Sequence, residues 1–190
     1  RPMTQAAEGY PRMRWTLAEF EKLADVGILT EQDRVELIGG ELVPMSPKGN
    51  HHEVLKVSLL EFWIPKVVGT KTTTITETTL RTSEKDFLEP DFVFWPRAIP
   101  IKDLKPAVIS LLVEISDSSL AYDLGRKAKI YAGLGLTDYW VIDAVKRTTR
   151  IHRAPAADGF GQITDHAPTD MLIPAQHAGL AVRLADLDLR

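Results

Sequence analysis

Apolar residues recur at helical spacing in two stretches of the N-terminal half of the chain. The first stretch follows Thr16 and Glu19, which fit a capping box, and it predicts a short helix to about Asp25. The second stretch predicts a helix that ends at Pro65 or at Gly69. Its apolar positions are Leu55, Leu59, Phe62 and Trp63.

Short apolar runs bounded by glycine, proline or polar residues indicate strands. Two such runs in 34–47 meet at Gly39 and Gly40, a pair able to take the positive φ angles of a hairpin turn. Threonine enrichment favours a strand within 70–81, whereas 154–179 is expected to be mostly loop. The remaining expected strands are 91–95, 108–115, two within 138–153 joined by a turn near 145–147, and a final alternating one in 179–189.

Glu114 interrupts one of these apolar runs. Side chains alternate between the two faces of a strand, so Glu114 shares a face with Ser110, Leu112 and Ser116 and lies toward the carboxyl end of the run. Open α/β sheets place their ligands at this end of the strands. Glu114 is therefore a candidate site residue, and the alternative is a carboxylate that reaches solvent past the strand end.

A third helix is predicted from a cap at Ser118 or Ser119 to about Leu134, and Lys127 lies in the middle of its apolar stripe. Burying an unpaired ammonium costs several kcal/mol, so an inward lysine needs a carboxylate partner or a chemical task. Asp123, one turn earlier, is the candidate partner. The alternative is a lysine whose stem packs in the stripe while its amine reaches water.

Three acidic residues, Glu36, Asp91 and Glu114, occur on strands that we expect to share one sheet. Two carboxylates about 4 Å apart repel by about 4 kcal/mol at an effective dielectric constant of about 20, so their convergence requires protons or cations. The chain contains no cysteine. Oxygen ligands favour Mg²⁺, with Mn²⁺ as a substitute. Taken singly, Asp91 after Pro90 also fits the cap of a turn.

Length and charge limit the kind of protein. The 190 residues suit a single domain, which we place at 15–190 after a loosely held arm at 1–14. A formal charge of −3 and a pI of about 6.0 exclude a strong overall basic field, so any polyanion site must be local. The sequence shows neither a signal pattern nor an apolar run of the roughly 20 residues that span a membrane, and a cytoplasmic protein is expected.

The acidic and basic positions belong to an ordered series of motifs that resembles the PD-(D/E)XK restriction-endonuclease-like superfamily, and more closely its Uma-type group of endonucleases. The motifs are VELIGGELVPMSP, HH before a helix, EPDFVF, LLVEISDSS, DLGRKAKIYAGLG and DYWVID, with GLAVRL as a looser match. The resemblance covers most of the chain. It implies an α/β fold with a mixed central β-sheet flanked by helices, an N-terminal helix and a β-hairpin.

The resemblance also implies roles for the acids. In the superfamily pattern, the Asp of the PD pair and the following acid hold a divalent metal ion. Here these residues are Asp91 and Glu114, with the main-chain carbonyl of Ile115 beside them. Glu36 would complete the acidic cluster through water or a second ion.

The lysine of the superfamily pattern is displaced in this chain. The pattern places a lysine two residues after the second acid, where this chain has Ser116. In the Uma-type group a helical lysine supplies the amine, and Lys127 matches that position, with Asp123 to steer it and Tyr131 on the same helix face. His52 fits the group's spacing for a phosphate contact, and a simple helix cap is the alternative.

The reaction that the resemblance implies is metal-assisted hydrolysis of a DNA phosphodiester by an in-line water molecule. Residues 121–153 carry a local net charge of +4, which could guide the DNA backbone, with an ordinary solvated hairpin edge as the alternative. Two other functions stay open: a nuclease-fold module that binds DNA or a protein partner with little or no catalysis, and a hydrolase of another phosphoester. Cutting both strands of a duplex also favours a two-fold homodimer.

Overall fold

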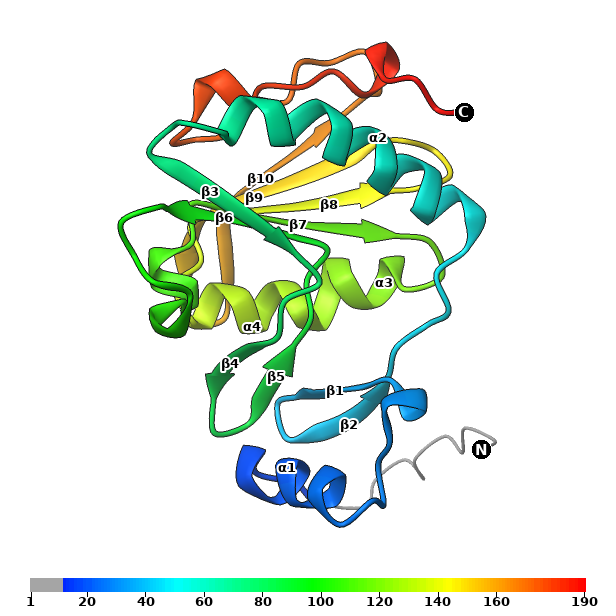
Figure 1. The fold of residues 1–190 in the computed structure, drawn as a ribbon, viewed down its shortest axis with the longest axis vertical. Helices are drawn as coiled ribbons and strands as arrows, with labels where there is room; N and C mark the ends of the chain where they lie inside the picture. Colours follow the sequence, from blue (N-terminus) through cyan, green and yellow to red (C-terminus); the bar gives the residue numbers. More distant parts are fainter. Residues whose placement is uncertain (1–11) are drawn as a thin grey trace.

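A six-stranded sheet forms the centre of the molecule in the computed structural model, which describes residues 12–190 (Figure 1). Its strand order is β10-β9-β8-β7-β6-β3. β7 and β8 run parallel and the other neighbouring pairs run antiparallel, so the sheet is mixed. Its strands are β3 (Thr72–Thr76), β6 (Phe92–Pro96), β7 (Leu111–Ser116), β8 (Asp138–Asp143), β9 (Thr149–Ala156) and β10 (Gly159–His166).

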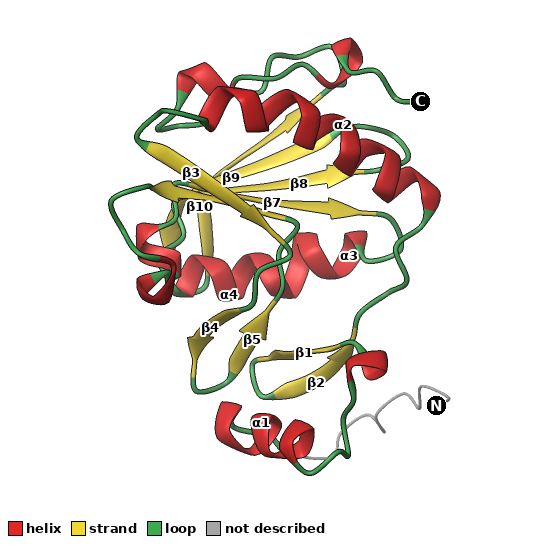
Figure 2. Ribbon diagram, viewed as in Figure 1, coloured by secondary structure: helices red, strands yellow, loops and turns green. Residues whose placement is uncertain are grey.

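Helices cover both faces of this sheet (Figure 2). α2 (Asn50–Val67) crosses one face. The other face carries a nearly continuous helix made of α3 (Leu120–Tyr122), the π-helical turn η4 (Asp123–Lys127) and α4 (Ala128–Gly133). The predicted α/β core, with a mixed central sheet flanked by helices, is confirmed.

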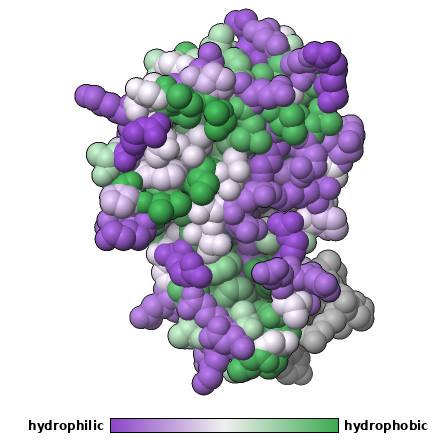
Figure 3. All heavy atoms as spheres, in the orientation of Figure 1, coloured by the Kyte–Doolittle hydropathy of each residue, from purple (hydrophilic) through white to green (hydrophobic). Residues whose placement is uncertain are grey.

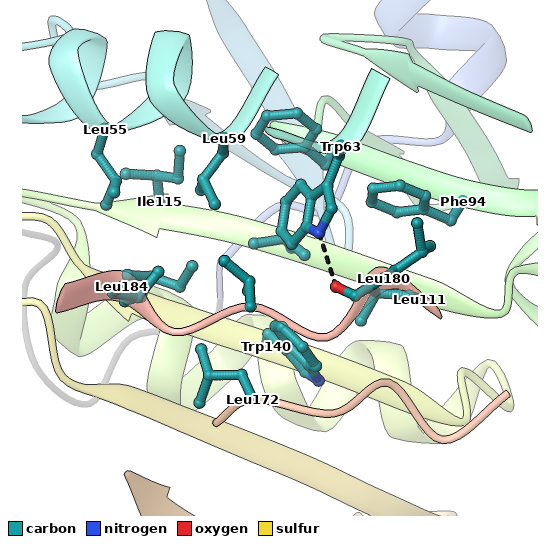
Figure 4. Close-up of a cluster of buried hydrophobic side chains, with 14 of the residues drawn as sticks. Leu55, Leu59, Trp63, Phe94, Leu111, Ile115, Trp140, Leu172, Leu180 and Leu184 are labelled. Carbon is teal, nitrogen blue, oxygen red and sulfur yellow. Dashed lines mark hydrogen bonds between the residues drawn. The ribbon is translucent and has the colours of Figure 1, made fainter. Parts of the chain in front are cut away.

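A large hydrophobic cluster lies between α2 and the central sheet (Figure 4). Leu111 and Ile115 of β7 enter this cluster beside Trp63, whereas Leu112 packs in a second cluster on the opposite face. The alternation predicted along β7 is therefore confirmed, and it places Glu114 on the face of the α3–α4 helix.

A smaller sheet and α1 (Leu17–Asp25) form the other end of the molecule (Figure 1). Gly39 (φ 57°) and Gly40 (φ 81°) make the predicted hairpin turn. The predicted capping box of α1 is present, because the Glu19 amide donates to Thr16 Oγ1 and the Thr16 amide donates to Glu19 Oε2. The sheet has the order β2-β1-β5-β4, with β1 (Val35–Ile38), β2 (Glu41–Pro44), β4 (Leu80–Ser83) and β5 (Asp86–Leu88).

Of the two ends predicted for the second helix, Pro65 is wrong, since α2 continues through this proline to Val67, and Gly69, with a φ of 74°, directly follows the C-cap Val68. Pro65 removes one helical hydrogen bond from the carbonyl of Glu61. Both residues are exposed, so water can satisfy that carbonyl. A proline in the last, solvent-facing turn therefore does not stop this helix.

The single strand expected in 70–81 is two strands. β3 belongs to the central sheet and β4 to the smaller one, and Glu77 between them takes a positive φ of 54°. Threonine enrichment correctly indicated extended backbone, but it carried no signal for the point where the chain passes from one sheet to the other.

The third helix covers the predicted span but contains the π-helical turn η4. Its N-cap is Ser119, whose hydroxyl donates to the Asp123 carboxylate. A π-helical turn inserts an extra residue into an α-helix, and this changes which side chains face the sheet. Both Asp123 and Lys127 are buried in this turn.

Two expectations for the C-terminal part are wrong. The segment expected to be loop contains the end of β9 and all of β10, whose residues are mostly exposed and therefore lack the alternation that marks a half-buried strand. The final strand is instead a pair of 3-10 turns with a β-bridge between Leu172 and Val182. Leu180, Val182 and Leu184 alternate because they enter the main cluster.

The remaining described segments are short. The predicted arm at 1–14 falls largely outside the described residues. Arg14, near the start of the described range, donates to the Gly39 carbonyl at 3.2 Å.

None of the helices within residues 12–190 is long and apolar enough to cross a membrane. The isolated 3-10 helices are η1 (Glu31–Asp33), η2 (Ile101–Asp103), η3 (Pro106–Val108), η5 (Ala178–Leu180) and η6 (Leu184–Asp186).

Candidate active site

An open pocket of about 260 Å³ lies where the two sheets meet the start of α2 and the α3–α4 helix. Hydrophilic residues cover most of the side of the molecule on which α2 and the α3–α4 helix begin (Figure 3). The residues with ionisable side chains that line the pocket are Glu36, Lys48, His52, Glu89, Asp91, Glu114, Asp117, Asp123 and Lys127. The pocket thus gathers most of the residues that the sequence singled out.

Lys127 is the cation at the centre of the acidic cluster in this pocket. Its Nζ lies 3.1 Å from Glu36 Oε1, 3.3 Å from Glu114 Oε1 and 3.4 Å from Asp123 Oδ1. Only 5% of Lys127 is exposed, so its amine does not reach water along a packed stem. The structure therefore brings Lys127 together with its predicted partner Asp123 and with two carboxylates from other elements.

Burial makes the charges of this group depend on one another. Burial raises the pKa of Glu114 well above its usual value, Lys127 opposes that rise, and the charges of Asp123, Asp91 and Glu36 add to it. Burial also raises the pKa of Glu36, again against Lys127. Burial alone would lower the pKa of Lys127, but Glu114, Glu36 and Asp123 raise it well above its usual value, so the amine stays an ammonium.

Glu36 reaches the pocket from the smaller sheet, so the expectation that the three acids share one sheet is wrong. Its strand, β1, pairs with β2 and β5. The Glu36 carboxylate accepts from the Glu89 amide at 3.3 Å and contacts Lys127 with its other oxygen. The acids converge because the two sheets meet at this point, which alternation within one strand could not reveal.

Asp91 lies immediately before β6 rather than on the strand. Its Oδ2 accepts from the Ile115 amide at 2.8 Å, and its Oδ1 lies 2.9 Å from His52 Nε2 and 3.5 Å from Lys56 Nζ. Burial would raise the pKa of Asp91, but the His52 contact, the Ile115 hydrogen bond and the Lys56 charge together lower it. Asp91 is therefore held ionised beside Glu114, whose pKa is displaced in the opposite direction.

His52 lies in the first turn of α2, and its ring is buried against Asp91. The N-cap of this helix is Gly49, so the simple capping role considered for His52 is wrong. The other ring nitrogen, Nδ1, lies 3.3 Å from Glu53 Oε1. His52 thus joins the candidate site through Asp91.

The sequence interpretation missed Lys56. This residue is buried, follows His52 by one helical turn and contacts both Asp91 and Glu77. The spacing of four residues from His52 was the available signal, because residues at i and i+4 share one helix face. Burying the Lys56 ammonium without a partner would cost several kcal/mol, which is the argument that identified Lys127 as a candidate.

Two serine hydroxyls orient Asp123. Ser116, at the position where the superfamily has its lysine, donates to Asp123 Oδ2 at 2.5 Å, and Ser119 donates to the same oxygen at 2.7 Å.

Tyr131 is fully buried and packs on Tyr139, with ring centroids 5.0 Å apart. Tyr131 lies on the predicted helix face but in the hydrophobic cluster rather than in the pocket wall.

The donor set fits a hard divalent cation in its chemistry. Four buried carboxylates, those of Glu36, Asp91, Glu114 and Asp123, contact the ammonium groups of Lys127 and Lys56, so the acids outnumber the lysines that contact them. The buried Asp123 Oδ1 accepts no hydrogen bond within residues 12–190, and its ion pair with Lys127 is 3.4 Å long. In the arrangement shown, however, no three His, Asp or Glu side chains of this range surround one point, because Lys127, Lys56 and His52 lie between the acids.

The basic patch expected in 121–153 is largely neutralised. Arg126, Arg150 and Arg153 pair with Glu41, Asp165 and Asp138, respectively, and Lys127 is inside the pocket. The exposed cations that remain from this set are Lys129, Lys146 and Arg147. The guidance of a DNA backbone by this segment stays a prediction.

Comparison with known proteins identifies the family. The crystal structure of a "putative nuclease belonging to DUF820" from Anabaena variabilis ATCC 29413 matches 90% of this chain and 96% of its own with a TM-score of 0.66, and at 17% identity this similarity concerns the fold. No curated protein matches the chain. The model of the Uma2 family, described as "Putative restriction endonuclease", matches residues 17–185. The chain belongs to this Uma2 family of restriction-endonuclease-like proteins.

Proposed function

We propose that this protein is a metal-dependent endonuclease that hydrolyses DNA phosphodiester bonds. The observation that carries the proposal is the buried ammonium of Lys127 among Glu36, Glu114 and Asp123, in the pocket that Asp91 also lines. A cluster of buried acids with pKa values displaced in opposite directions is typical of a catalytic site. Family membership agrees with this assignment.

Asp91 and Glu114, with the main-chain carbonyl of Ile115, would hold the ion, Mg²⁺ or Mn²⁺. When bound, such an ion lowers the pKa of a water molecule and offsets charge on the phosphate. Glu36 adds a carboxylate that can act through water. His52, Lys56 and the Ile115 amide keep Asp91 ionised, as a metal ligand must be.

Lys127 acts as a cation in this scheme. Because its pKa is raised well above the usual value, it cannot remove a proton from water at neutral pH. It orients the attacking water by hydrogen bonding and offsets the negative charge that develops on the phosphate. Asp123, held by Ser116 and Ser119, positions the Lys127 ammonium.

The direct test is cleavage of supercoiled plasmid and of circular single-stranded DNA with Mg²⁺, with Mn²⁺ and with EDTA. We expect cleavage with either ion, and a loss of at least about 100-fold in Asp91→Asn, Glu114→Gln and Lys127→Met. Lys129→Met is the matched control, because Lys129 lies two residues from Lys127 on the same helix but is exposed. Full activity of Lys127→Met would contradict the role given to this lysine.

A second candidate function is a binding module of the nuclease fold. It is favoured by Ser116 in place of the superfamily lysine and by the ion pairs that already satisfy the acids. Metal binding without cleavage of either DNA, shown by calorimetry with Mn²⁺ beside the cleavage assay, would support this candidate over the nuclease.

We also propose that duplex cleavage uses a two-fold homodimer, since cutting both strands needs two active sites. Light scattering at several protein concentrations tests this proposal. A monomer mass at every concentration, together with double-strand cleavage, would contradict it.

A further inference from the structure

A second group of charges, which the proposed reaction does not use, lies next to Asp91. The carboxylate of Glu77 contacts Lys48, and its Oε1 lies 2.9 Å from Lys56 Nζ. Lys48 lines the active-site pocket, and Lys56 contacts Asp91. The Lys48–Glu77–Lys56 group is therefore continuous with the candidate active site.

The two lysines of this group are close enough to repel each other. Burial lowers the pKa of Lys56, Asp91 opposes that change, and the charge of Lys48 lowers the pKa further. The Glu77 carboxylate contacts both ammonium groups and lies between the two positive charges. Two cations held around one anion form the arrangement with which proteins bind a phosphate oxygen.

Glu77 is held in a strained conformation at the outer side of the group. It follows β3 with a φ of 54°, a region that residues other than glycine rarely adopt, and its amide donates to the Pro90 carbonyl at 3.2 Å. Backbone strain of this kind is found where function requires it. The Glu77 side chain is 45% exposed, whereas those of Lys48 and Lys56 are 19% and 7% exposed. Glu77 is thus the member of the group that a ligand from solvent can replace.

We propose that Lys48 and Lys56 form a subsite for one phosphate of the nucleic-acid backbone, and that the Glu77 carboxylate fills this subsite until the substrate displaces it. The inference rests on the proposed nuclease function for the identity of its ligand. No bond is made or broken in the exchange, since one anion replaces another between the same two ammonium groups.

The subsite would take a phosphate beside the one that is cut. Lys56 contacts Asp91 on one side and Glu77 on the other, so an anion in the place of Glu77 lies next to the metal-binding acids and not among them. Glu77 would then weaken the binding of any anion that cannot displace it. This contact makes Glu77 a specificity-determining residue.

The test is the binding of a fluorescein-labelled single-stranded oligonucleotide in EDTA, measured by fluorescence anisotropy between about 50 and 200 mM salt. We expect Glu77→Gln to bind about two- to five-fold more tightly than the unchanged protein. Lys48→Ala should bind more weakly, and the negative slope of log association constant against log salt should become shallower by about 0.7, which corresponds to one lost phosphate contact on a single strand. Lys48 is chosen because Lys56 also supports the buried Asp91.

Glu21→Gln is the matched control. Glu21 forms an exposed ion pair with Arg81, 2.6 Å long, outside the pocket, so its change removes the same charge without touching the subsite. Equal tightening in Glu21→Gln and Glu77→Gln would overturn the proposal, because the effect would then reflect net charge alone. The double variant Lys48→Ala/Glu77→Gln should lose most of the gain of Glu77→Gln.

The outcomes separate this subsite from the proposed function. Cleavage of DNA with unchanged binding in Glu77→Gln would overturn the subsite and leave the nuclease in place. Tighter binding in Glu77→Gln without cleavage by the unchanged protein would support the subsite and count against the nuclease. Absence of oligonucleotide binding in every variant would overturn the subsite.

Discussion

Lys127 contacts carboxylates from β1, from β7 and from its own helical turn. Removing one partner of a buried ion pair costs more than the pair contributes, because the remaining charge stays buried without compensation. Without Lys127, three buried carboxylates would remain without their cation. The sequence predicted the inward lysine and Asp123 from helical spacing, but it could not predict Glu36 as a partner, because that contact depends on how two sheets meet.

We expect Lys127→Met to lower the free energy of unfolding by about 3–5 kcal/mol near neutral pH. The loss should be smaller at about pH 5 than at about pH 8. Burial raises the pKa of Glu114 above the unfolded value of 4.5, and the positive charge of Lys127 opposes that rise. Stability gained by protonating such an acid is present below the unfolded pKa and is lost as pH rises through the folded pKa, which the substitution raises further.

Urea unfolding at the two pH values measures this difference. Lys129→Met, on the exposed side of the same helix, should change the stability by less than about 0.5 kcal/mol at either pH. An equal loss for Lys127→Met at both pH values would contradict the linkage between the lysine and the acids.

At the scale of the elements, the sequence predictions were accurate where burial or a cap leaves a local signal in the sequence. β7 alternates between two buried faces, and α1 carries its capping box, so both were predicted correctly. β10 is mostly exposed, and the π-helical turn differs from an α-helix by one residue, so neither leaves a periodic signal. The contact of the missed Lys56 with Glu77 joins α2 to the residue after β3, where the chain takes a positive φ that the sequence did not indicate.

The π-helical turn makes a testable prediction through Gly125. A Cβ added at Gly125 would meet no atom within 4 Å, so Gly125→Ala should gain about 0.5–1 kcal/mol of stability from the lower entropy of the unfolded chain. Gly133→Ala is the matched control, because a Cβ there would lie 3.3 Å from the Ala157 carbonyl oxygen and should gain less.

Urea unfolding of both glycine variants tests the prediction. A loss of stability in Gly125→Ala greater than that in Gly133→Ala would show that the turn itself needs glycine. A gain of stability would show that the π-helical turn does not need glycine at this position.

At the scale of the whole molecule, the smaller sheet is joined to the central sheet around the pocket. Arg126 donates to Glu41 Oε2 at 2.6 Å and to the Ile38 carbonyl at 3.2 Å, so the helix that carries Lys127 also holds the hairpin that carries Glu36. The opposite face of the central sheet depends on α2 and on the C-terminal segment, which lies beside it (Figure 1). The Trp63 indole donates to the Leu180 carbonyl at 2.9 Å across this contact (Figure 4).

Although the C-terminal segment lacks the predicted strand, its side chains complete the core. Leu184 is 1% exposed in the main cluster, so Leu184→Ala should lower the free energy of unfolding by about 2–4 kcal/mol through lost burial and an added cavity. Ile173→Ala, at a position that is 50% exposed, should change it by less than about 0.5 kcal/mol. Urea unfolding followed by tryptophan fluorescence measures both, since Trp63 and Trp140 lie in the same cluster. Equal effects of the two substitutions would mean that this segment is not part of the cooperative core, and the structure requires that it is, because Trp63 lies fully buried against it.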